Sequence, residues 1–455
     1  MTTNNSMLDS LSNINISFNG GDLSSDTGGI LLLSFISTNR LLDQFAGLPY
    51  NDQRTRFSEH NSNDSLLFQT VLRYLLGFFT QKDQETIQND PLLSQFFPAV
   101  SSQPTVSRFL PRITEETNNA FGHRLMDFGC SFANAHTEEI LIDADSTKTD
   151  TYGKQEDSAY IPHYQSVGYH PIVVNEYHTK VLLASFLRKG NTYSADECVA
   201  LMEEILKRID KDYRGKTRPV KFRGDAAFFN HELMELFEEQ ESPVLYAIRA
   251  KGYGRMEGDC TAAYYASEHS DDFTYTSSSP YYGEIEYAMT GSENSRRICF
   301  KLWFSESTDK ENQICLIPHV FGVITNLEDD PRKVIEFYCQ RGNSENFTKE
   351  LKNDFGANTL SHEQFVKNAF EFFTKSLAYN LFQIFRNLVL EGEDQKMQAG
   401  TFRRKYQKVA SRLSRHARKG FLRIASSFRY RKQFMKYFRR SCLKLPDFIQ
   451  PEPAV

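Results

Sequence analysis

The spacing of apolar residues changes near residue 138, and this change constrains the fold more than any other feature of the sequence. From Ile30 to about Phe97, apolar side chains recur every three or four residues, as in SLLFQTVLRYLLGFF, which predicts helices. Beyond residue 138, short apolar runs (EEILIDADST, HPIVVNEY and KVLLASFL) have brief connections, which predicts a meander of three strands. The chain is therefore expected to begin with helices and to continue into a sheet.

Two of the predicted strands end in an aspartate. Asp145 closes the first apolar run, and Asp225 closes the later run RPVKFRGD, after an amphipathic helix from about residue 194 to 212. In a three-strand meander followed by βαβ units, the first and fourth strands can lie side by side, so their carboxylates would meet at the strand ends. Strand alternation places Asp143 on the same side as Asp145, so Asp143 is a competing first carboxylate.

Residues 251–327 differ from their surroundings because Tyr, Thr, Ser and Gly are prominent there. The runs GEIEYAMT, RRICFKLWF and FGVITNL are typical of strands, and the segment is interpreted as an all-β insertion. Asp330 and Pro331 provide an N-cap and a first helical residue, which predicts a helix running to about Asn353. A further helix is predicted from Glu363 to about Leu390.

The helix after the insertion carries a patterned face. Tyr338, Arg341, Glu345 and Lys352 lie at offsets that share one side of an α-helix. A carboxylate flanked by two cations and a phenol suits a metal ligand beside a bound phosphate. The alternative is a solvent face joined by ion pairs of Glu345 with Lys349 or Arg341.

Asp145, Asp225 and Glu345 together would offer three carboxylates on rigid elements. Oxygen ligands with open water positions suit Mg²⁺, and two such ions can activate water or a 3′-hydroxyl and stabilise the leaving oxygen of a phosphodiester. With 58 acidic residues in the chain, the position of these three at strand ends and on a patterned helix is what gives them weight.

Charge is distributed unevenly along the chain. Residues 401–455 hold 16 Lys and Arg against two acids, whereas residues 1–400 carry a net charge of -19. Apolar residues between 402 and 428 recur every three or four positions, which predicts a basic amphipathic helix. Such a helix can lie on a membrane surface or bind calmodulin-like partners, and a basic tail on an acidic body suggests that the tail meets a polyanion.

Composition excludes several classes of protein. Seven cysteines are scattered without a CxxC pair, which argues against a disulfide framework or a zinc site and favours a reducing cytoplasm. No apolar run approaches the ~20 residues of a membrane span. The first basic residue is Arg40, so a charged signal-peptide start is not expected.

The stretch SSQPTVSR, residues 101–108, carries the capping chemistry of a helix start. It fits either an ordinary capped helix or the beginning of a recognition helix in a helix-turn-helix.

These blocks together resemble the DDE transposases of bacterial insertion sequences. Tyr338-x2-Arg341-x3-Glu345-x6-Lys352 matches the Y-R-E-K signature of that group, DADST and RGDAAF resemble its two aspartate blocks, and SSQPTVSR resembles its N-terminal stretch. LLASFLRKGN and FFTKSLAYNLFQIFRNL also look like family blocks, and in detail the chain is similar to insertion-sequence family 1380 over roughly residues 15–445. Ala226 and Ala227 depart from the family, which usually has Ser-Gly there.

The resemblance implies an α/β fold with an RNase H-like catalytic core, in which a mixed five-stranded sheet with flanking helices is interrupted by a β-rich insertion. The expected parts are a helical N-terminal DNA-binding region (1–136), the first part of the core (137–250), the insertion (251–327), the final part of the core (328–400) and a basic helical C-terminal segment (401–455).

The implied activity is cut-and-paste DNA transposition by Mg²⁺-dependent hydrolysis and strand transfer, with a hairpin intermediate. Asp145, Asp225 and Glu345 would be the catalytic residues and would hold two Mg²⁺ ions, for which Mn²⁺ can substitute. Expected DNA contacts are Tyr338, Arg341, Lys352, Gln103, Ser107, Arg108, Trp303, Arg403, Arg404, Arg412 and Arg415. Trp303 has two interpretations, stacking of a flipped base or a core position in a strand.

The expected partners are the terminal inverted repeats of the element and the target DNA, bound by a homodimer in a synaptic complex. The expected location is the bacterial cytoplasm, on DNA, with no membrane contact. The alternatives are a domesticated protein that binds DNA without cutting it and a free-standing RNase H-like nuclease.

Overall fold

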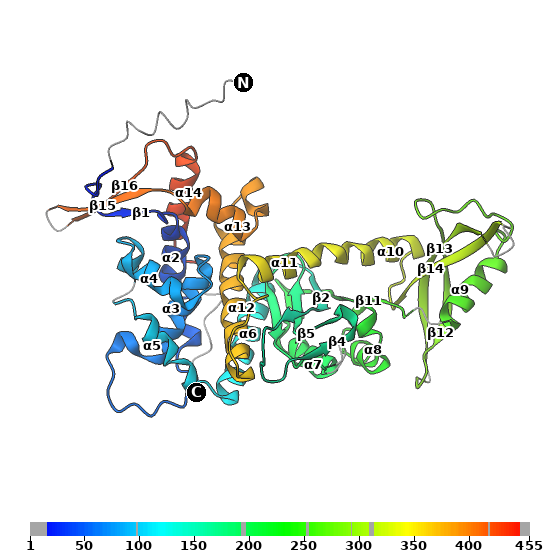
Figure 1. Cartoon of the computed structure of the whole chain (residues 1–455). Coiled ribbons are helices and arrows are strands. Elements are labelled where there is room, and N and C mark those ends of the chain that lie inside the picture. Colours follow the sequence, from blue (N-terminus) through cyan, green and yellow to red (C-terminus); the bar gives the residue numbers. More distant parts are fainter. Residues whose placement is uncertain are drawn as a thin grey trace, which may run out of the picture.

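The structure is a computed structural model that describes residues 16–96, 99–192, 197–251, 254–292, 294–308, 314–416 and 419–445. The molecule is elongated (Figure 1): elements from both ends of the chain gather at one end, a sheet with its helices fills the middle, and a β-ribbon projects at the other end. Among the residues described, no helix is long and apolar enough to cross a membrane.

The N-terminal part is helical, as the apolar spacing predicts. Its helices are α2 (Gly29–Thr38), α3 (Asn63–Leu75), α4 (Gln84–Asn89), α5 (Gln103–Ser107) and α6 (Glu115–His136). The Ser62 and Thr114 side chains cap α3 and α6 by accepting hydrogen bonds from backbone amides. With five residues, α5 is about 7.5 Å long, and the Ser102 side chain at its N-cap makes no capping hydrogen bond to a backbone amide. The choice between a capped helix and a recognition helix stays a prediction.

An eight-stranded mixed sheet occupies the middle of the molecule, with the strand order β12-β13-β14-β11-β10-β2-β6-β7. Its core strands are β2 (Ile140–Ser146), β6 (Ile172–Glu176), β7 (Leu182–Phe186), β10 (Val220–Gly224) and β11 (Leu245–Arg249). β2, β6 and β7 are antiparallel neighbours, whereas β10 is parallel to both β2 and β11. The predicted meander and the predicted adjacency of the first and fourth strands are both confirmed.

Helices and small strands surround these core strands. The helix predicted at 194–212 corresponds to α7 (Cys198–Arg208), and residues 193–196 before it lie outside the described residues. A further helix, α8 (His231–Glu238), precedes β11. α6 packs against β7, where the rings of Phe121 and Phe186 both contact Phe373. Two small sheets are built from β3 (Thr149–Asp150), β4 (Ala159–Ile161) and β5 (Ser166–Tyr169), and from β8 (Asp212–Tyr213) and β9 (Lys216–Thr217).

The β-ribbon corresponds to the predicted insertion, but the expectation that it is all-β is wrong. It contains α9 (Arg255–Tyr265) beside β12 (Tyr281–Ala288), β13 (Ser295–Thr308) and β14 (Ile314–Thr325). α9 forms because Met256, Cys260 and Tyr264 recur every four residues and are buried. β14 pairs with β11 as well as with β13, so the ribbon continues the central sheet.

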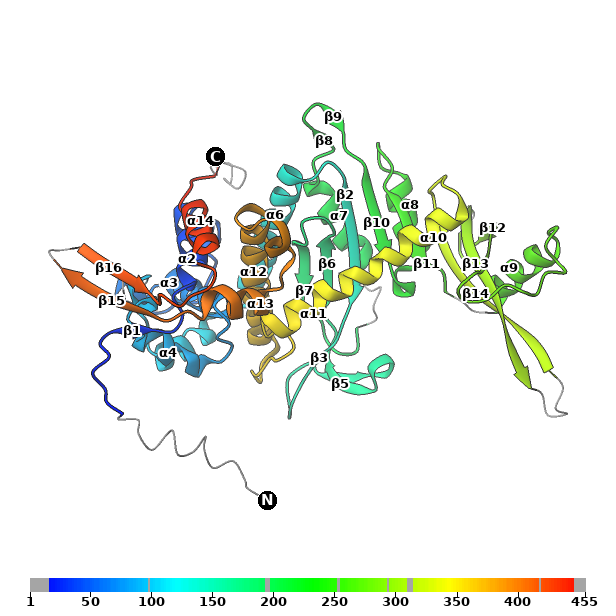
Figure 2. The same cartoon turned by 90° about the horizontal axis from the view of Figure 1, so that it is seen from above.

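The helices after the insertion cross the sheet. Figure 2 shows α10 (Pro331–Cys339) and α11 (Ser344–Asp354) in line across the strands, leading from the ribbon to α12 (Phe365–Leu388). A 3₁₀ turn at Gln340–Asn343 separates α10 from α11, so the single helix predicted to run to Asn353 is interrupted. This turn contains Gly342, a residue that weakens a helix by about 1 kcal/mol relative to Ala.

The basic C-terminal segment is not the amphipathic helix predicted over 402–428. It consists of α13 (Ala399–Phe402), a π-helical turn (Arg403–Gln407), a hairpin of β15 (Ser411–His416) and β16 (Lys419–Ile424), and α14 (Arg431–Ser441). The segment forms a strand instead of a helix because β15 pairs with β1 (Leu23–Ser24), near the start of the chain. α14 lies beside α2 in both views, so the two ends of the chain form one structural unit (Figures 1 and 2).

Candidate active site

Two parallel strand ends place the predicted aspartates beside each other. In the β2–β10 ladder, Ala144 is paired with Gly224, and Asp145 and Asp225 are the next residues on their strands. Asp225 also caps the 3₁₀ turn that follows, where its carboxylate accepts a hydrogen bond from the Ala227 amide at 2.8 Å. Ala226 and Ala227, which depart from the family pattern, thus still form a tight turn after this aspartate.

Asp143, the alternative to Asp145 as the first carboxylate of the site, is buried and hydrogen-bonded in the core. Both of its oxygens accept hydrogen bonds from Arg223 at 2.7 Å, and the Ser344 hydroxyl donates to one of them. The Asp143 and Arg223 side chains are 2% and 0% exposed. Arg223 further donates to the Phe337 carbonyl oxygen at 2.9 Å, which anchors α10 to the sheet. Asp143 is therefore held in the core by Arg223 and Ser344.

Arg341 joins the two aspartates at the strand ends. Its Nη2 lies 3.1 Å from an Asp145 oxygen and 3.8 Å from an Asp225 oxygen. Asp145 and Asp225 are 26% and 36% exposed, so a small ion in solution can reach both. The Arg341 Nε is buried without a hydrogen-bond partner in the part of the chain that the structure describes. The guanidinium thus holds the two carboxylates together through one nitrogen only.

At the strand ends, burial and neighbouring acidic groups change the pKa values of the side chains. Burial raises the pKa of Asp145 to about 6; Arg341 opposes this rise, and the negative charges of Asp225 and Glu345 add to it. Burial, with the charges of Asp145 and Asp225, also raises the pKa of Tyr164 to about 12. Tyr164 donates a hydrogen bond to the Ser146 carbonyl oxygen. It was missed in the sequence because a lone tyrosine in a loop gives no signal.

Glu345 lies in the first turn of α11 and stands apart from the two aspartates. Its side chain is 57% exposed and its nearest cation is Lys349 at 3.8 Å, which is the ion pair of the alternative interpretation. Within the described ranges, no three His, Cys, Asp or Glu side chains are close enough to hold one metal ion. Carboxylates repel each other without a cation between them, and the single charge of Arg341 contacts only Asp145 and Asp225. The donors are all carboxylate oxygens, the ligand type that Mg²⁺ prefers.

The other residues of the patterned helix face line the same place. Lys352 donates from Nζ to the Thr147 hydroxyl at 2.6 Å, just beyond Asp145, and burial lowers its pKa. Tyr338 is buried against Phe321 of the ribbon, and burial raises its pKa to about 12. Arg341 and Lys352 thus both reach residues at the end of β2, whereas Tyr338 lies toward the ribbon.

Trp303 lies on β13 with its ring stacked on His319, at 5.4 Å between centroids and 19° between planes. Its neighbours Leu302 and Phe304 are buried, whereas Trp303 is half-buried on the opposite face of the strand. Lys301 Nζ is 5.7 Å from the Trp303 ring centroid. The indole therefore belongs to a partly open aromatic surface, which disfavours the core interpretation.

The remaining predicted DNA contacts fall into separate places. Gln103 and Ser107 hydrogen-bond to each other and to Gln81 on the N-terminal helices, and Arg108 follows them as the C-cap of α5. Arg404 and Arg412 are exposed on the C-terminal segment, and the side chain of Arg415 lies outside the described part.

Arg403, which was predicted as a DNA contact, lies largely buried between the N-terminal helices and α11. It is 9% exposed, and it donates to the carbonyl oxygens of Leu75, Tyr74 and Asp354. Burial lowers its pKa to about 10. The basic pattern concealed this role because a buried arginine looks the same in sequence as an exposed one.

Comparison with known proteins gives the family of this chain. Residues 7–443 match the family model described as transposase DDE domain group 1. The chain belongs to this family and is a DNA transposase of the DDE class. Among solved structures it is similar to the piggyBac transposase in a synaptic complex with hairpin DNA, with a TM-score of 0.48, 10% identity, and coverage of 83% of this chain and 79% of that chain. No curated protein matches the chain.

Proposed function

We propose that this chain is the transposase of an insertion sequence, acts by cut-and-paste transposition, and has its active site at the ends of β2 and β10. The order of the core strands supports an RNase H-like core, because three antiparallel strands are followed by two parallel ones on the other side of β2. The observation that carries the proposal is that Asp145 and Asp225 share one cation at these strand ends, beside α11, which carries Glu345.

Asp145, Asp225 and Glu345 are the residues that would hold Mg²⁺, or Mn²⁺ in its place, with two ions per site. When bound, the metal activates water or a 3′-hydroxyl and stabilises the leaving oxygen of the phosphodiester. Arg341, released from the aspartates, can bind a DNA phosphate with its planar fork, and Lys352 adds a point charge beside Thr147. Tyr338 and Trp303 would contact DNA from the ribbon side, where the indole can stack on a base of a hairpin intermediate.

Both ends of the element must be joined, so the proposal includes a homodimer on DNA that carries the terminal inverted repeats and then engages the target. The proposal also includes a bacterial origin and the division of the chain into five parts at residues 136, 250, 327 and 400. The further DNA contacts that we propose are Gln103, Ser107, Arg108, Arg404, Arg412 and Arg415.

The test is cleavage of labelled DNA that carries the element's own end, with Mg²⁺ or with EDTA, on denaturing gels. Glu345→Gln removes the third carboxylate, and Glu336→Gln is a matched control because Glu336 is 55% exposed on the neighbouring α10. Metal-dependent breaks at the end should vanish in Glu345→Gln and persist in Glu336→Gln.

Other outcomes lead to other functions. Tight end-specific binding without any cleavage would favour the domesticated DNA-binding protein, and cleavage without sequence preference or strand joining would favour a nuclease. Cleavage that survives in Glu345→Gln would place the third carboxylate elsewhere.

A further inference from the structure

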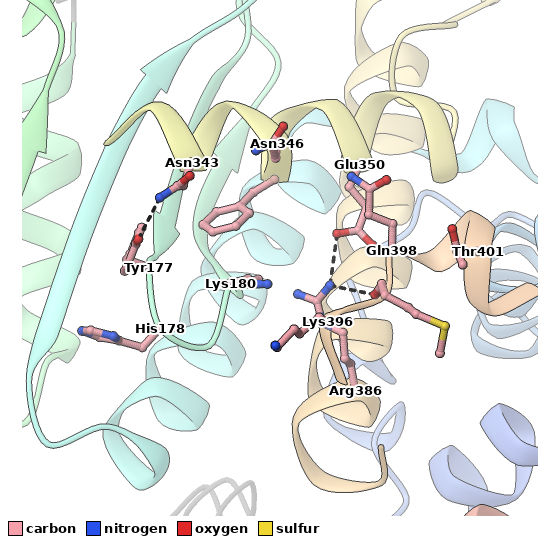
Figure 3. Close-up of a pocket in the computed structure, with 12 residues that line it drawn as sticks. Tyr177, His178, Lys180, Asn343, Asn346, Glu350, Arg386, Lys396, Gln398 and Thr401 are labelled. Atoms are coloured by element: carbon pink, nitrogen blue, oxygen red, sulfur yellow. Dashed lines mark hydrogen bonds and ion pairs between the residues drawn. The ribbon is translucent and has the colours of Figure 1, made fainter. Parts of the chain in front are cut away.

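A hollow of about 690 Å³ opens on the flank of α11. Its walls come from the turn between β6 and β7, from α11, from the end of α12 and from residues 396–401 (Figure 3). Polar side chains line it, including Tyr177, Lys180, Asn346, Arg386 and Gln398. None of these residues takes part in the strand-end site, so this hollow, the α11 pocket, needs its own explanation.

Arg386 at the base of the α11 pocket has a donor without a partner. The residue is 2% exposed, and its Nη1 donates to Glu350 at 3.4 Å and to the Met397 carbonyl oxygen at 3.2 Å. Its Nη2 is buried and has no hydrogen-bond partner among the described residues. Buried guanidinium nitrogens are normally satisfied, so this one is available for an acceptor entering the pocket.

Lys180 brings a second cation to the same place. Burial lowers its pKa, and the positive charge of Arg386 lowers it further. Its Nζ lies 5.5 Å from the Phe347 ring centroid, and Figure 3 shows the amine on the side of the pocket facing Arg386. The turn holds the backbone of Lys180 in the left-handed region at φ 65°, and the Tyr379 hydroxyl donates to its carbonyl oxygen.

The negative charge in the pocket does not balance these cations. Among the described residues that line it, Glu350 is the only acid, and its oxygens also accept from the Ala399 amide at 2.7 Å and from Gln383. Two cations that face one engaged carboxylate favour an added anion. Asn346, Gln398 and Thr401 at the rim can donate to its oxygens.

We propose that the α11 pocket binds a phosphodiester of the DNA on which the chain acts, away from the reacting bond. This inference rests on the proposed function. Glu350 lies five residues beyond Glu345, which is about 7.5 Å along α11 and on a different side of the helix. The β6–β7 turn adjoins the start of β2, where the Tyr177 amide donates to the Leu141 carbonyl oxygen, whereas Asp145 lies toward the other end of that strand. The bound phosphate would therefore lie on the flank of α11 away from the strand ends. Asn343, which donates to the Tyr177 hydroxyl at 3.1 Å, joins the start of α11 to this turn.

The test measures DNA affinity against salt concentration in EDTA, where no cleavage occurs. The probes are a labelled duplex carrying the element's end and an unrelated duplex. Lys180→Asn removes the charge and suits a left-handed backbone, and Arg386→Lys keeps the pair with Glu350 but removes the free donor. Arg214→Asn is the matched control, since Arg214 is an exposed cation with φ 54° in the β8–β9 turn.

Loss of one phosphate contact lowers the slope of log affinity against log salt by about 1. We expect that change for Lys180→Asn, a several-fold weaker affinity for Arg386→Lys, and neither effect for Arg214→Asn. Circular dichroism and thermal midpoints identify any variant that fails to fold. If one pocket variant does not fold, the DNA affinity of the other one tests the proposal.

An unchanged slope and affinity in both folded pocket variants would overturn the inference. A free phosphate would be the ligand instead if inorganic phosphate raised the thermal midpoint of the wild type but not of Lys180→Asn while DNA binding stayed unchanged. Cleavage by the wild type in Mg²⁺ is measured in parallel. A wild type that cleaves while the variants bind normally refutes only the pocket, whereas a wild type that neither binds nor cleaves refutes the proposed function.

Discussion

Two arginine–aspartate pairs lie two residues apart along β2 and differ in almost every physical respect. Arg223 and Asp143 are buried, joined by two hydrogen bonds of 2.7 Å, and flanked by the rings of Tyr177 and Phe337. Arg341 reaches Asp145 through one nitrogen at 3.1 Å, and both side chains are partly open to water. Both pairs lie on the side of the sheet that α10 and α11 cover.

The difference shows that the position of an aspartate along the strand decides whether its carboxylate is available to a ligand. Asp143 sits within the ladder, where its charge must be neutralised permanently because it cannot return to water. Asp145 lies just beyond the last residue pair of the β2–β10 ladder, where water or an ion can replace its partner. The same residue type on the same face therefore serves the fold at one position and is available for chemistry at the next.

Breaking the buried pair should give the largest effect. Arg223→Met leaves Asp143 charged and unpaired in the core, and we expect a loss of about 3–5 kcal/mol in the free energy of unfolding. Urea denaturation followed by circular dichroism measures it. The double variant with Asp143→Asn should recover part of the loss. A loss below about 1 kcal/mol in the single variant would mean that the two pairs are equivalent.

Breaking the open pair should alter metal binding more than stability. Arg341→Gln removes the cation that contacts both Asp145 and Asp225, so Mn²⁺ should bind the DNA-free protein about tenfold more tightly, or about 1.4 kcal/mol. The free energy of unfolding should change by no more than about 1 kcal/mol. Isothermal titration calorimetry with Mn²⁺ gives the affinity, and Asp225→Asn is the control that should weaken it. Weaker binding in Arg341→Gln would show that Arg341 supports the metal and does not compete with it.

Glu139, just before β2, gives a third ion pair for the comparison, and its removal should have the smallest effect on stability. Glu139 contacts Lys221 at 2.7 Å and His178 at 3.6 Å, and its hydrogen bond with His178 lowers its pKa to about 2 while raising that of His178. The stabilisation by Glu139 is therefore complete above about pH 4.5 and is lost as the pH falls toward 2. The contribution of His178 is present below its ordinary pKa near 6.5 and is lost as the pH rises through its raised value.

Glu139→Gln should accordingly cost less than about 1 kcal/mol at pH 5.5, because the pair is only half-buried. The difference from wild type in urea denaturation should shrink as the pH is lowered from 5 to 3. A difference that grows on acidification would contradict the assignment of the lowered pKa to Glu139.

The strand ends could be predicted from the sequence because their signals are local. An apolar run that ends in an acid fixes both the strand and the place of its carboxylate, as in β2 and β10. The bridging role of Arg341 could not be predicted, since it depends on how the 3₁₀ turn after α10 directs its side chain. Helical offsets placed Tyr338 and Lys352 on one face but could not show that Tyr338 packs against the ribbon.

The C-terminal segment could not be predicted because its structure depends on a distant partner. Leu413 and Phe421 fit a three-to-four spacing, but the ladder pairs Leu413 with Leu422 in a hairpin. β1, which stabilises the edge of this hairpin, lies near the start of the chain and leaves no trace in the local periodicity. Basic residues such as Arg403 were assigned to DNA for the same reason, since their burial also depends on the N-terminal helices.

The union of the two chain ends has a consequence for how the protein is made. The Thr27 hydroxyl donates to the Ser411 hydroxyl at 2.7 Å across 384 positions of sequence, and Gly28 lies so close to Tyr406 that a Cβ there would meet its carbonyl oxygen. At about 5–20 residues per second, a ribosome needs roughly 20–80 s to synthesise the stretch between them. During that time α2 has been made but lacks its partners, so the first helix of the described residues is among the last to complete its packing.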